Sequence, residues 1–294
     1  MKLSREWLND YVDCLDLSPQ AFNDLITTKV AEVDAVHSLG APLRTGVICH
    51  VVSVSDHPER KTLKVATIDI GGAPVQVVCG APNCRAGMNT VYLPPGSTAI
   101  SADGVIAVEK RAIGGVESAG MLASEYELEL SGDHSGIIEI AAAVKPGTAA
   151  TAHFGDGDVV LEIDNKSLTH RPDLWSHLGF ARELAALLQR PMKLLPDMWA
   201  DSANEGRTAL AELKQGKANI DIQVDADTKC RRFLGVEIAN LTPSPSPLWI
   251  RRRLFAVGAG VRNLLVDLSN YVMHDVGQPT HTYDADKLTG KTLH

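Results

Sequence analysis

The sequence has 294 residues, 45% of them hydrophobic, and a formal net charge of −8. This length predicts two or three domains, and the negative charge argues against a protein that binds nucleic acid indiscriminately. The N-terminus carries no long apolar run and the five cysteines form no C-x-x-C pair, so we expect no signal peptide, membrane span, disulfide framework or zinc site, and a reducing cytoplasm fits.

The first forty residues predict two helices followed by a strand. Ser4 is placed to cap a short helix. Ser18 and Pro19 start a second helix, because serine is favoured at the cap and proline in the first turn. Residues 31–36 then alternate between apolar and polar side chains, which indicates a strand.

The next segment predicts a small barrel of short strands. Residues 63–70 alternate with a period of two, Gly71 and Gly72 form a hairpin turn, and residues 74–79 form the return strand. Several short strands separated by turns indicate a barrel or a sandwich. A five-stranded OB-fold barrel over residues 40–149 is the most economical interpretation.

Three sequence blocks in this segment resemble the tRNA-binding barrel that several synthetases share. They are C-G-A-P-N at 79–83, R-A-G-M at 85–88 and G-V-E-S-A-G-M-L-A-S-E at 115–125. No single block is specific, since each glycine taken alone can simply shape a turn, but the three together are specific. The resemblance implies tRNA contacts by residues in and near these blocks: His57, Lys61, Lys64, Asn83, Arg85, Ser118, Met121, Ser124 and Glu125.

Charge is unevenly distributed along the chain. Residues 46–140 hold six Lys or Arg against eleven Asp or Glu, so this segment cannot hold RNA tightly by phosphate neutralisation alone. Residues 229–262 hold seven basic residues and one acidic residue. This second stretch, with Arg251 and Arg252, is therefore the better candidate for a phosphate contact, although a solvated basic helix face is an equal alternative.

The rest of the chain predicts further strands and helices. Residues 159–165 form a strand, and a helix starts at Pro172 and ends before Pro191. Residues 196–214 have no clear period and indicate a linker. Two strands at 220–224 and 233–239 follow.

The last eighty residues end in two further helices. Ser246 and Pro247 cap a helix that Gly258 terminates. Residues 264–266 are predicted as a short strand, and the helix that follows stops at Gly277.

Four blocks outside the barrel widen the resemblance to almost the whole chain. They are H-R-P-D at 170–173, L-G-F-A-R-E at 178–183, V-D-L-S-N-Y-V at 266–272 and G-Q-P-T-H-T-Y-D at 277–284. In this order they resemble the N-terminal portion of the bacterial phenylalanyl-tRNA synthetase beta subunits. The family continues well past the equivalent of residue 294, so we expect this chain to be either part of a longer protein or a shortened gene product.

The resemblance implies an α+β multidomain fold. A small α/β domain of residues 1–39 and 150–195 would carry the OB-fold barrel, 40–149, as an insertion. The linker at 196–214 would lead to residues 215–294, which would open a mixed α/β editing domain of the B3/B4 type.

The resemblance also implies partners and a reaction. In this family, a class II ligase, an alpha subunit charges phenylalanine tRNA with ATP and Mg, and the assembly is α2β2. This chain has no phosphate-binding glycine loop. We therefore expect no cofactor, no metal and no aminoacylation by this chain alone, and neither DNA nor a membrane as a partner.

An editing pocket is implied as well, because an apolar pocket rejects the extra hydroxyl of tyrosine poorly. His281 matches the family's editing histidine, with Arg262 and Asn270 as further candidates. Gly260 stands where the family usually has an arginine, and the remaining pocket residues would lie beyond residue 294. A histidine packed at a helix–strand junction is the alternative for His281.

Two other functions stay open. The chain can be a free-standing tRNA-binding protein that never joins an alpha subunit. The acidic barrel also leaves room for a protein-binding module without a role in RNA binding.

Overall fold

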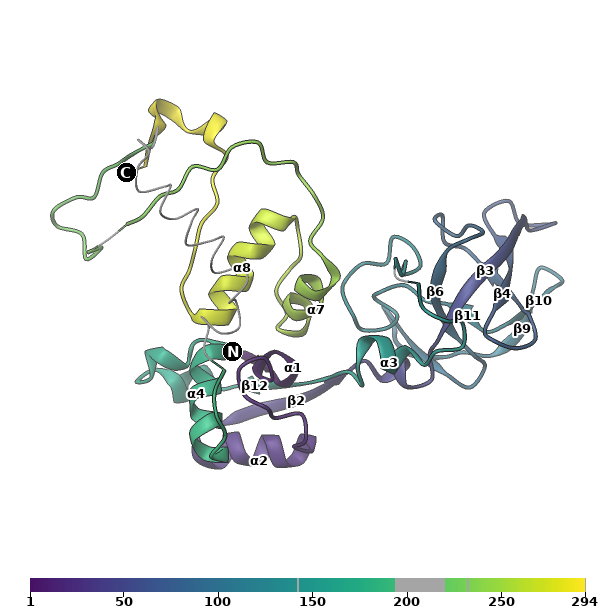
Figure 1. Ribbon diagram of the computed structural model, residues 1–294, viewed down its shortest axis with the longest axis horizontal. Coiled ribbons are helices and arrows are strands. Elements are labelled where there is room, and N and C mark those ends of the chain that lie inside the picture. The colour runs from purple at the N-terminus through teal and green to yellow at the C-terminus, as the bar shows by residue number, and fades with distance from the viewer. Residues whose placement is uncertain (142, 194–219, 232, 294) are drawn as a thin grey trace. The chain divides into compact units, whose positions relative to one another are not determined.

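The computed structural model describes residues 1–141, 143–193, 220–231 and 233–293 (Figure 1). The predicted linker at 196–214 lies outside these described residues. The chain divides into two compact units. Unit 1 comprises Met1–Trp7, Leu15–His170 and Pro247–Val261, and unit 2 comprises Leu8–Cys14, Arg171–Ser246 and Arg262–His294.

Unit 1 begins with a three-stranded antiparallel sheet. Its order is β1 (Lys2–Ser4), β12 (Asp158–Ile163) and β2 (Val33–Leu39). The central strand β12 is almost entirely buried, as its apolar run requires. The sheet confirms the strands predicted near 31–36 and 159–165, and it combines strands that precede and follow the barrel segment in the chain.

Two capped helices accompany this sheet. Helix α1 (Arg5–Leu8) starts where the Ser4 hydroxyl accepts a hydrogen bond from the Trp7 backbone N–H at 3.0 Å. Helix α2 (Pro19–Lys29) starts where the Ser18 hydroxyl accepts from the Ala21 N–H at 3.1 Å. Both predicted caps are therefore confirmed, because each depends only on local hydrogen bonding.

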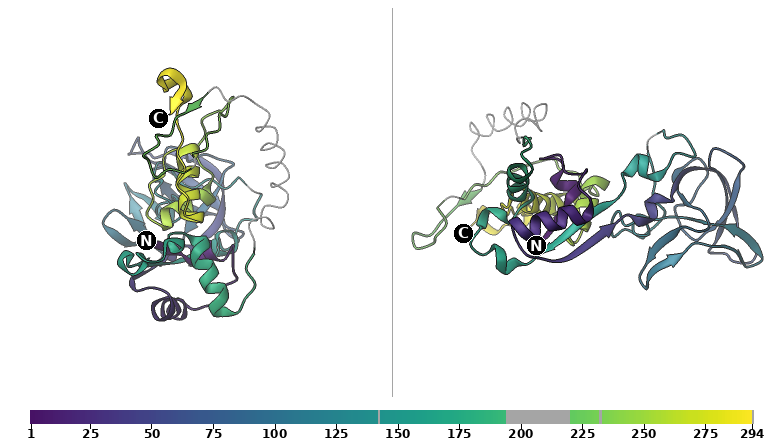
Figure 2. Two further views of the ribbon diagram at one scale, coloured as in Figure 1. Left: turned by 90° about the vertical axis from the view of Figure 1, so that its left-hand side faces the viewer. Right: turned by 90° about the horizontal axis from the view of Figure 1, so that it is seen from below.

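A five-stranded antiparallel sheet forms a nearly closed, barrel-like structure (Figures 1 and 2). Its order is β11 (Met121–Leu122), β6 (Asn89–Leu93), β3 (Val47–Asp56), β4 (Lys64–Asp69) and β5 (Val75–Cys79). Two hairpins lie between β6 and β11 in the chain: β7 (Thr98–Ser101) with β8 (Gly104–Ala107), and β9 (Lys110–Ile113) with β10 (Val116–Ala119).

Side chains on the barrel strands alternate between two apolar cores. On β3, Ile48 belongs to one core and Cys49 and Val51 belong to the other. On β6, Val91 and Tyr92 divide in the same way. Because successive strand residues point to opposite sides, β3 and β6 each contribute to two packed faces.

The chain enters and leaves the barrel at neighbouring points. The 3-10 helix η1 (Ala41–Arg44) precedes β3, and helix α3 (Ala150–Phe154) follows the barrel segment. Val47 pairs with Ala149 in an isolated bridge, and the Ile48 N–H donates to the Thr148 carbonyl at 2.8 Å. The 3-10 helix η2 (Asn165–Leu168) follows β12, and helix α7 (Leu248–Ala256) completes unit 1.

Unit 2 packs helix α4 (His177–Leu188) against helix α8 (Leu264–Val276). The Tyr11 hydroxyl donates to the Asp275 carboxylate at 2.7 Å, and both residues are buried, so residues 8–14 are held to α8. The parallel pair β13 (Asp221–Ile222) and β14 (Thr292–Leu293) and the 3-10 helices η4 (Ala285–Lys287) and η5 (Thr289–Lys291) complete the described elements of this unit. No described helix of the chain is long and apolar enough to span a bilayer.

The prediction of one continuous helix from Pro172 is wrong. A 3-10 turn, η3 (Pro172–Leu174), is followed by a break at Trp175, and α4 then starts at His177. The Ser176 hydroxyl accepts from the Gly179 N–H at 3.0 Å. This cap satisfies a free N–H group at the start of the helix, which is why α4 begins there.

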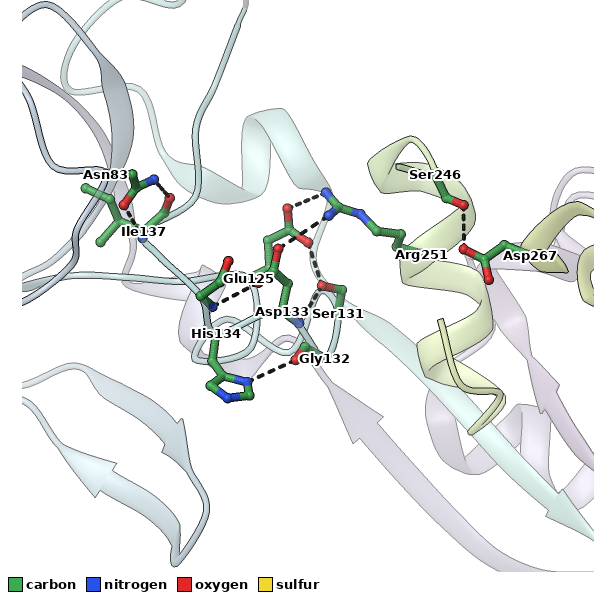
Figure 3. Close-up of polar contacts among 11 residues, drawn as sticks. Asn83, Glu125, Ser131, Gly132, Asp133, His134, Ile137, Ser246, Arg251 and Asp267 are labelled. Atoms are coloured by element: carbon green, nitrogen blue, oxygen red, sulfur yellow. Dashed lines mark hydrogen bonds and ion pairs between the residues drawn. The ribbon is translucent and has the colours of Figure 1, made fainter. Parts of the chain in front are cut away.

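Three further predictions in the last seventy residues are also wrong. Residues 264–266 form the first turn of α8 and not a strand, because the Asn263 side chain caps that helix by accepting from the Val266 N–H. Ser246 does not cap α7, since Pro247 occupies the cap position and the Ser246 hydroxyl donates to Asp267 (Figure 3). Residues 233–239 do not pair as a strand in the described structure, and a strand requires a hydrogen-bonding neighbour.

The predicted helix ends at Gly258 and Gly277 are confirmed, and each glycine has a φ of +75°.

Candidate nucleic-acid interface

Ser118 closes the gap between β10 and β5. Its side chain is buried, and its hydroxyl accepts from the Val78 backbone N–H at 3.0 Å and donates to the Gly120 carbonyl at 3.0 Å. The Gln76 side chain adds a second link by donating to the Glu117 carbonyl at 2.8 Å. The hydroxyl of this predicted tRNA-contact residue therefore serves barrel closure.

His57 is likewise buried, at 4% exposed. Its Nε2 lies 2.8 Å from the Ile113 carbonyl, and its Nδ1 accepts from the backbone N–H groups of Glu59 and Arg60, each at 3.1 Å. These partners fix the tautomer with the proton on Nε2. The ring therefore holds the β3–β4 loop, which carries Arg60 and Lys61, against the end of β9.

Asn83 pairs with the backbone of Ile137 (Figure 3). Its amide N–H donates to the Ile137 carbonyl at 2.8 Å, and its amide oxygen accepts from the Ile137 N–H at 3.0 Å. Gly136 makes this close approach possible, since a Cβ at that position would lie 2.4 Å from the Asn83 oxygen. The C-G-A-P-N block thus builds a fixed turn.

The basic residues of the predicted site differ in their exposure and in the partners that they contact. Lys64 is half-buried, and its ammonium donates to the Cys84 carbonyl at 2.7 Å and the Pro82 carbonyl at 3.2 Å. Arg85 pairs with Glu139, and both side chains are about half exposed. Lys61 is exposed. Lys61 and Arg85 are therefore the predicted cations of this rim that solvent reaches most directly.

Two predicted residues lie at the end of the third block. Met121, on β11, is half-buried against the core that contains Ile48. Ser124 is buried and makes a local turn with Glu127: its N–H donates to the Glu127 carboxylate at 2.7 Å and its hydroxyl at 2.8 Å. Met121 therefore supports the rim by packing, and Ser124 supports it by local hydrogen bonding.

Glu125 forms a buried ion pair with Arg251 of α7 (Figure 3). The two charged groups are 2.5 Å apart, and their side chains are 11% and 20% exposed. Arg251 also lies 3.5 Å from the Asp133 carboxylate, and Ser131 donates its hydroxyl to Glu125. Burial raises the pKa of Glu125 against the opposing effects of Ser131 and Arg251.

Asp133 is the second carboxylate of this cluster. Hydrogen bonding from the Ser135 backbone N–H lowers the pKa of Asp133, and the Arg251 charge acts in the same direction. Arg251 therefore faces two carboxylates of unequal burial, and it links α7 to the loop that follows β11.

The two arginines that follow Arg251 are also used inside unit 1. Arg252 lies 2.7 Å from the Glu6 carboxylate and donates to the Phe154 carbonyl, and its side chain is 16% exposed. The Arg253 guanidinium lies 5.6 Å from the ring centroids of both Trp7 and Trp249, within the range of a cation–π contact. The three arginines of this basic stretch that lie in α7 are therefore engaged in ion pairs and packing contacts. The exposed members of the stretch among the described residues are Lys229, Arg231 and Arg262.

The candidate editing residues all lie in unit 2. His281 is exposed, with its ring 6.4 Å from that of Tyr283. The Thr280 hydroxyl lies 3.1 Å from the Ser269 hydroxyl, so the residues adjoining these two, His281 and Asn270, belong to segments held together. Arg262 precedes α8 and is exposed, whereas Asn270 lies in the middle of that helix.

Three basic residues of the barrel were not among the predicted contact residues. Arg60, Lys110 and Arg111 are also exposed on the barrel, although Lys110 pairs with Glu117 at 2.8 Å. Within the described ranges, no group of three or more His, Cys, Asp or Glu side chains is arranged to hold a metal ion. The exposed basic side chains of the barrel thus include those of Arg60, Lys61, Arg85, Lys110 and Arg111.

Two family models match parts of this chain. A model described as "Putative tRNA binding domain" matches residues 46–149, and one described as "B3/4 domain" matches residues 229–294. The first match coincides with the barrel-like sheet and its hairpins.

Curated relatives match the whole chain. Phenylalanine–tRNA ligase beta subunits are 38% identical in Solibacter usitatus, 34% in Porphyromonas gingivalis and 37% in Rhodopseudomonas palustris, each over 100% of this chain. The alignments cover 34%, 35% and 35% of those proteins, so the chain spans about a third of their length.

Among solved structures, the MetRS related protein from Pyrococcus horikoshii aligns with 35% of this chain and 85% of its own, at 18% identity. Its TM-score of 0.25 is too low to support an argument about fold or function.

Proposed function

We propose that this chain, a relative of the phenylalanine–tRNA ligase beta subunits over its whole length, binds tRNA through its barrel as part of a phenylalanine–tRNA ligase. The observation that supports this most directly is the match of the tRNA binding model to residues 46–149, which are the residues that form the barrel-like sheet. A free-standing tRNA-binding protein is disfavoured, because the relatedness extends through all of the chain and not the barrel alone.

The barrel residues fall into two groups by their proposed roles. Lys61 and Arg85 contact tRNA phosphates, because they are exposed cations at the rim. Polar groups that are buried or half-buried hold that rim in place, as His57 does for the loop of Lys61 and Asn83 does for the turn before Arg85. With a net-acidic barrel, few phosphate contacts are available, so tRNA selection depends on shape and local contacts more than on charge.

We propose a fold and a domain arrangement as well. The barrel is an OB-fold carried by a small α/β domain of residues 1–39 and 150–195, and the B3/4 match supports an editing-type domain that begins near residue 215. In that domain His281, Asn270 and Arg262 contribute to the editing pocket. The Ser269–Thr280 contact supports the pairing of His281 with Asn270.

The ligase reaction itself is proposed to depend on a partner. An alpha subunit, in an α2β2 class II enzyme of the cytoplasm, activates phenylalanine with ATP and Mg. We propose that this chain does not charge tRNA by itself, and that its own part in the ligase is binding and assembly.

A direct experiment compares two double variants in binding to phenylalanine tRNA. Lys61→Ala with Arg85→Ala removes two exposed barrel cations, and Lys29→Ala with Lys166→Ala removes two exposed cations outside the barrel. The barrel variant should bind more weakly and show a salt dependence that is shallower by about 0.7–0.9 per lost contact. Equal affinity of the two variants would remove the barrel from the proposed interface.

A further inference from the structure

We propose that Cys79 and Cys84 form a reversible redox pair inside the barrel, which peroxide closes to a disulfide and a thiol reductant reopens. The pair itself is independent of what the barrel binds. Its consequence for tRNA affinity rests on the proposed function.

The two cysteines flank one tight turn. Cys79 ends β5, and the Ala81 N–H donates to its sulfur at 3.4 Å. The Cys84 N–H donates to the Ala81 carbonyl at 3.3 Å, so the chain reverses between the two cysteines. Both side chains are buried, at 5% and 1% exposed, and belong to one apolar core. Two thiols at the ends of one tight turn and in the same core need only a small movement to reach disulfide geometry.

Lys64 helps to make the two thiols unequal in acidity. It lies opposite Cys79 in the β4–β5 register, and its ammonium donates to the Cys84 carbonyl at 2.7 Å. The hydrogen bond from Cys79, with the Lys64 charge, lowers the pKa of the Cys84 thiol. The same hydrogen bond and burial raise the pKa of Cys79. One sulfur is thus favoured as the thiolate nucleophile and the other as the resolving thiol.

The chemistry balances with hydrogen peroxide as the oxidant. The Cys84 thiolate attacks one peroxide oxygen, the O–O bond breaks, and hydroxide leaves, so the sulfur becomes a sulfenic acid. The Cys79 sulfur then attacks the sulfenic sulfur, its proton goes to the departing hydroxyl, and water is released. The two sulfurs lose two electrons, and one peroxide becomes two molecules of water once the hydroxide takes up a proton. A dithiol reductant reverses the bond by exchange.

The other cysteines differ in ways that predict selectivity. Cys49 lies in the same core, but burial raises the pKa of its thiol to about 12, so it stays protonated and unreactive. Cys14 is buried in unit 2, and Cys230 is exposed. Cys230 therefore serves as the internal measure of ordinary exposed-thiol oxidation.

Closing the pair would act on the rim of the barrel. The turn between the two cysteines contains Asn83, whose amide pairs with Ile137, and Arg85 follows directly. A new covalent bond across the turn moves the Cys84 backbone that Lys64 holds. We therefore expect the oxidised and reduced forms to differ in tRNA affinity.

The test is peptide mapping of the intact chain after a hydrogen peroxide titration, without reduction and again after dithiothreitol. The expected result is a cross-linked Cys79–Cys84 species that has lost two hydrogen atoms and that dithiothreitol restores. It should appear equally in Cys230→Ser and be absent from Cys84→Ser and Cys79→Ala. Oxidation of Cys230 with the pair still reduced, or a cross-link to Cys49, overturns the proposal.

A second arm measures affinity of the two separated forms for phenylalanine tRNA. A difference between them that dithiothreitol abolishes supports the link to binding, and equal affinity overturns that link while the redox pair stands. If neither form binds tRNA while the cross-link still appears, the proposed function fails and the redox pair does not.

Discussion

The Ser118 hydroxyl accepts a hydrogen bond from the Val78 backbone N–H at 3.0 Å, and this contact joins β10 to the edge strand β5. A side-chain hydrogen bond therefore joins these two strands, whereas backbone hydrogen bonds join neighbouring strands elsewhere in the barrel. Edge strands left open are prone to pairing with other chains. Closure by Ser118 protects the β5 edge as well as fixing the rim.

Replacing Ser118 with alanine should destabilise the barrel. The change leaves the buried Val78 N–H without its acceptor, at a cost of about 1–3 kcal/mol in the free energy of unfolding. Denaturant unfolding measures the loss, with Ser53→Ala, at an exposed position on β3, as the control that should stay within about 0.5 kcal/mol. An equal effect of both variants would mean that the hydroxyl does not hold the barrel closed.

Replacing Arg251 with alanine should destabilise unit 1 in a way that depends on pH. It leaves Glu125 buried without its ionic partner, at a cost of about 3 kcal/mol. Burial already raises the pKa of Glu125 above 4.5 in the folded state, and the variant raises it further. The folded state then binds a proton more tightly than the unfolded state, so stability falls as pH rises above about 4.5.

Unfolding at pH 5 and at pH 8 measures this pH dependence. Arg111→Ala, at an exposed barrel position, is the matched control, and Glu125→Gln added to Arg251→Ala should flatten the pH profile. A loss of stability in Arg251→Ala that is independent of pH would contradict the buried-pair account.

Replacing Asn83 with aspartate should produce a defect that acid relieves. The carboxylate directs an oxygen at the Ile137 carbonyl in place of the amide N–H that donates there at 2.8 Å. Protonation restores a donor, so the folded pKa of the new carboxyl is raised and stability is lost as pH rises through it. Asn83→Ala loses the same bonds without a titrating group, and its profile should be flat by comparison. Parallel pH profiles for the two variants would count against this pairing.

Replacing Gly179 with alanine should disrupt the start of α4. A Cβ at this position would lie 1.8 Å from the Asp173 carbonyl oxygen, and backbone cannot yield as a flexible side chain does. We expect a loss of at least about 2 kcal/mol, measured by thermal unfolding. Gly72→Ala is the control, because its Cβ would meet nothing within 4 Å. A Gly179→Ala variant as stable as this control would show that the close approach is not maintained in solution.

The parts of the fold that depend on local chemistry were predictable. The Ser18 cap and the Gly258 and Gly277 stops needed only neighbouring residues. The strand prediction at 264–266 was wrong because it relied on the apolar run of those residues. The capping side chain of Asn263 is an equally local signal, and it marks the start of a helix.

The roles of the site residues were predictable only in part. Motif resemblance located His57, Asn83 and Ser118, but their partners lie 56, 54 and 40 residues away in the chain. Such contacts follow from the nearly closed, barrel-like sheet and not from spacing in the sequence. Arg251 was predicted from the charge of its stretch, yet its pairing with Glu125 depends on α7 reaching a loop 126 residues distant.

The most direct test of the central proposal is binding of this chain to phenylalanine tRNA and to an unrelated tRNA across a salt series. The account predicts preference for phenylalanine tRNA with a shallow salt dependence, since the barrel segment has six basic residues against eleven acidic ones. Binding without preference and with a steep salt dependence, or no binding at low salt, would contradict tRNA recognition by the barrel.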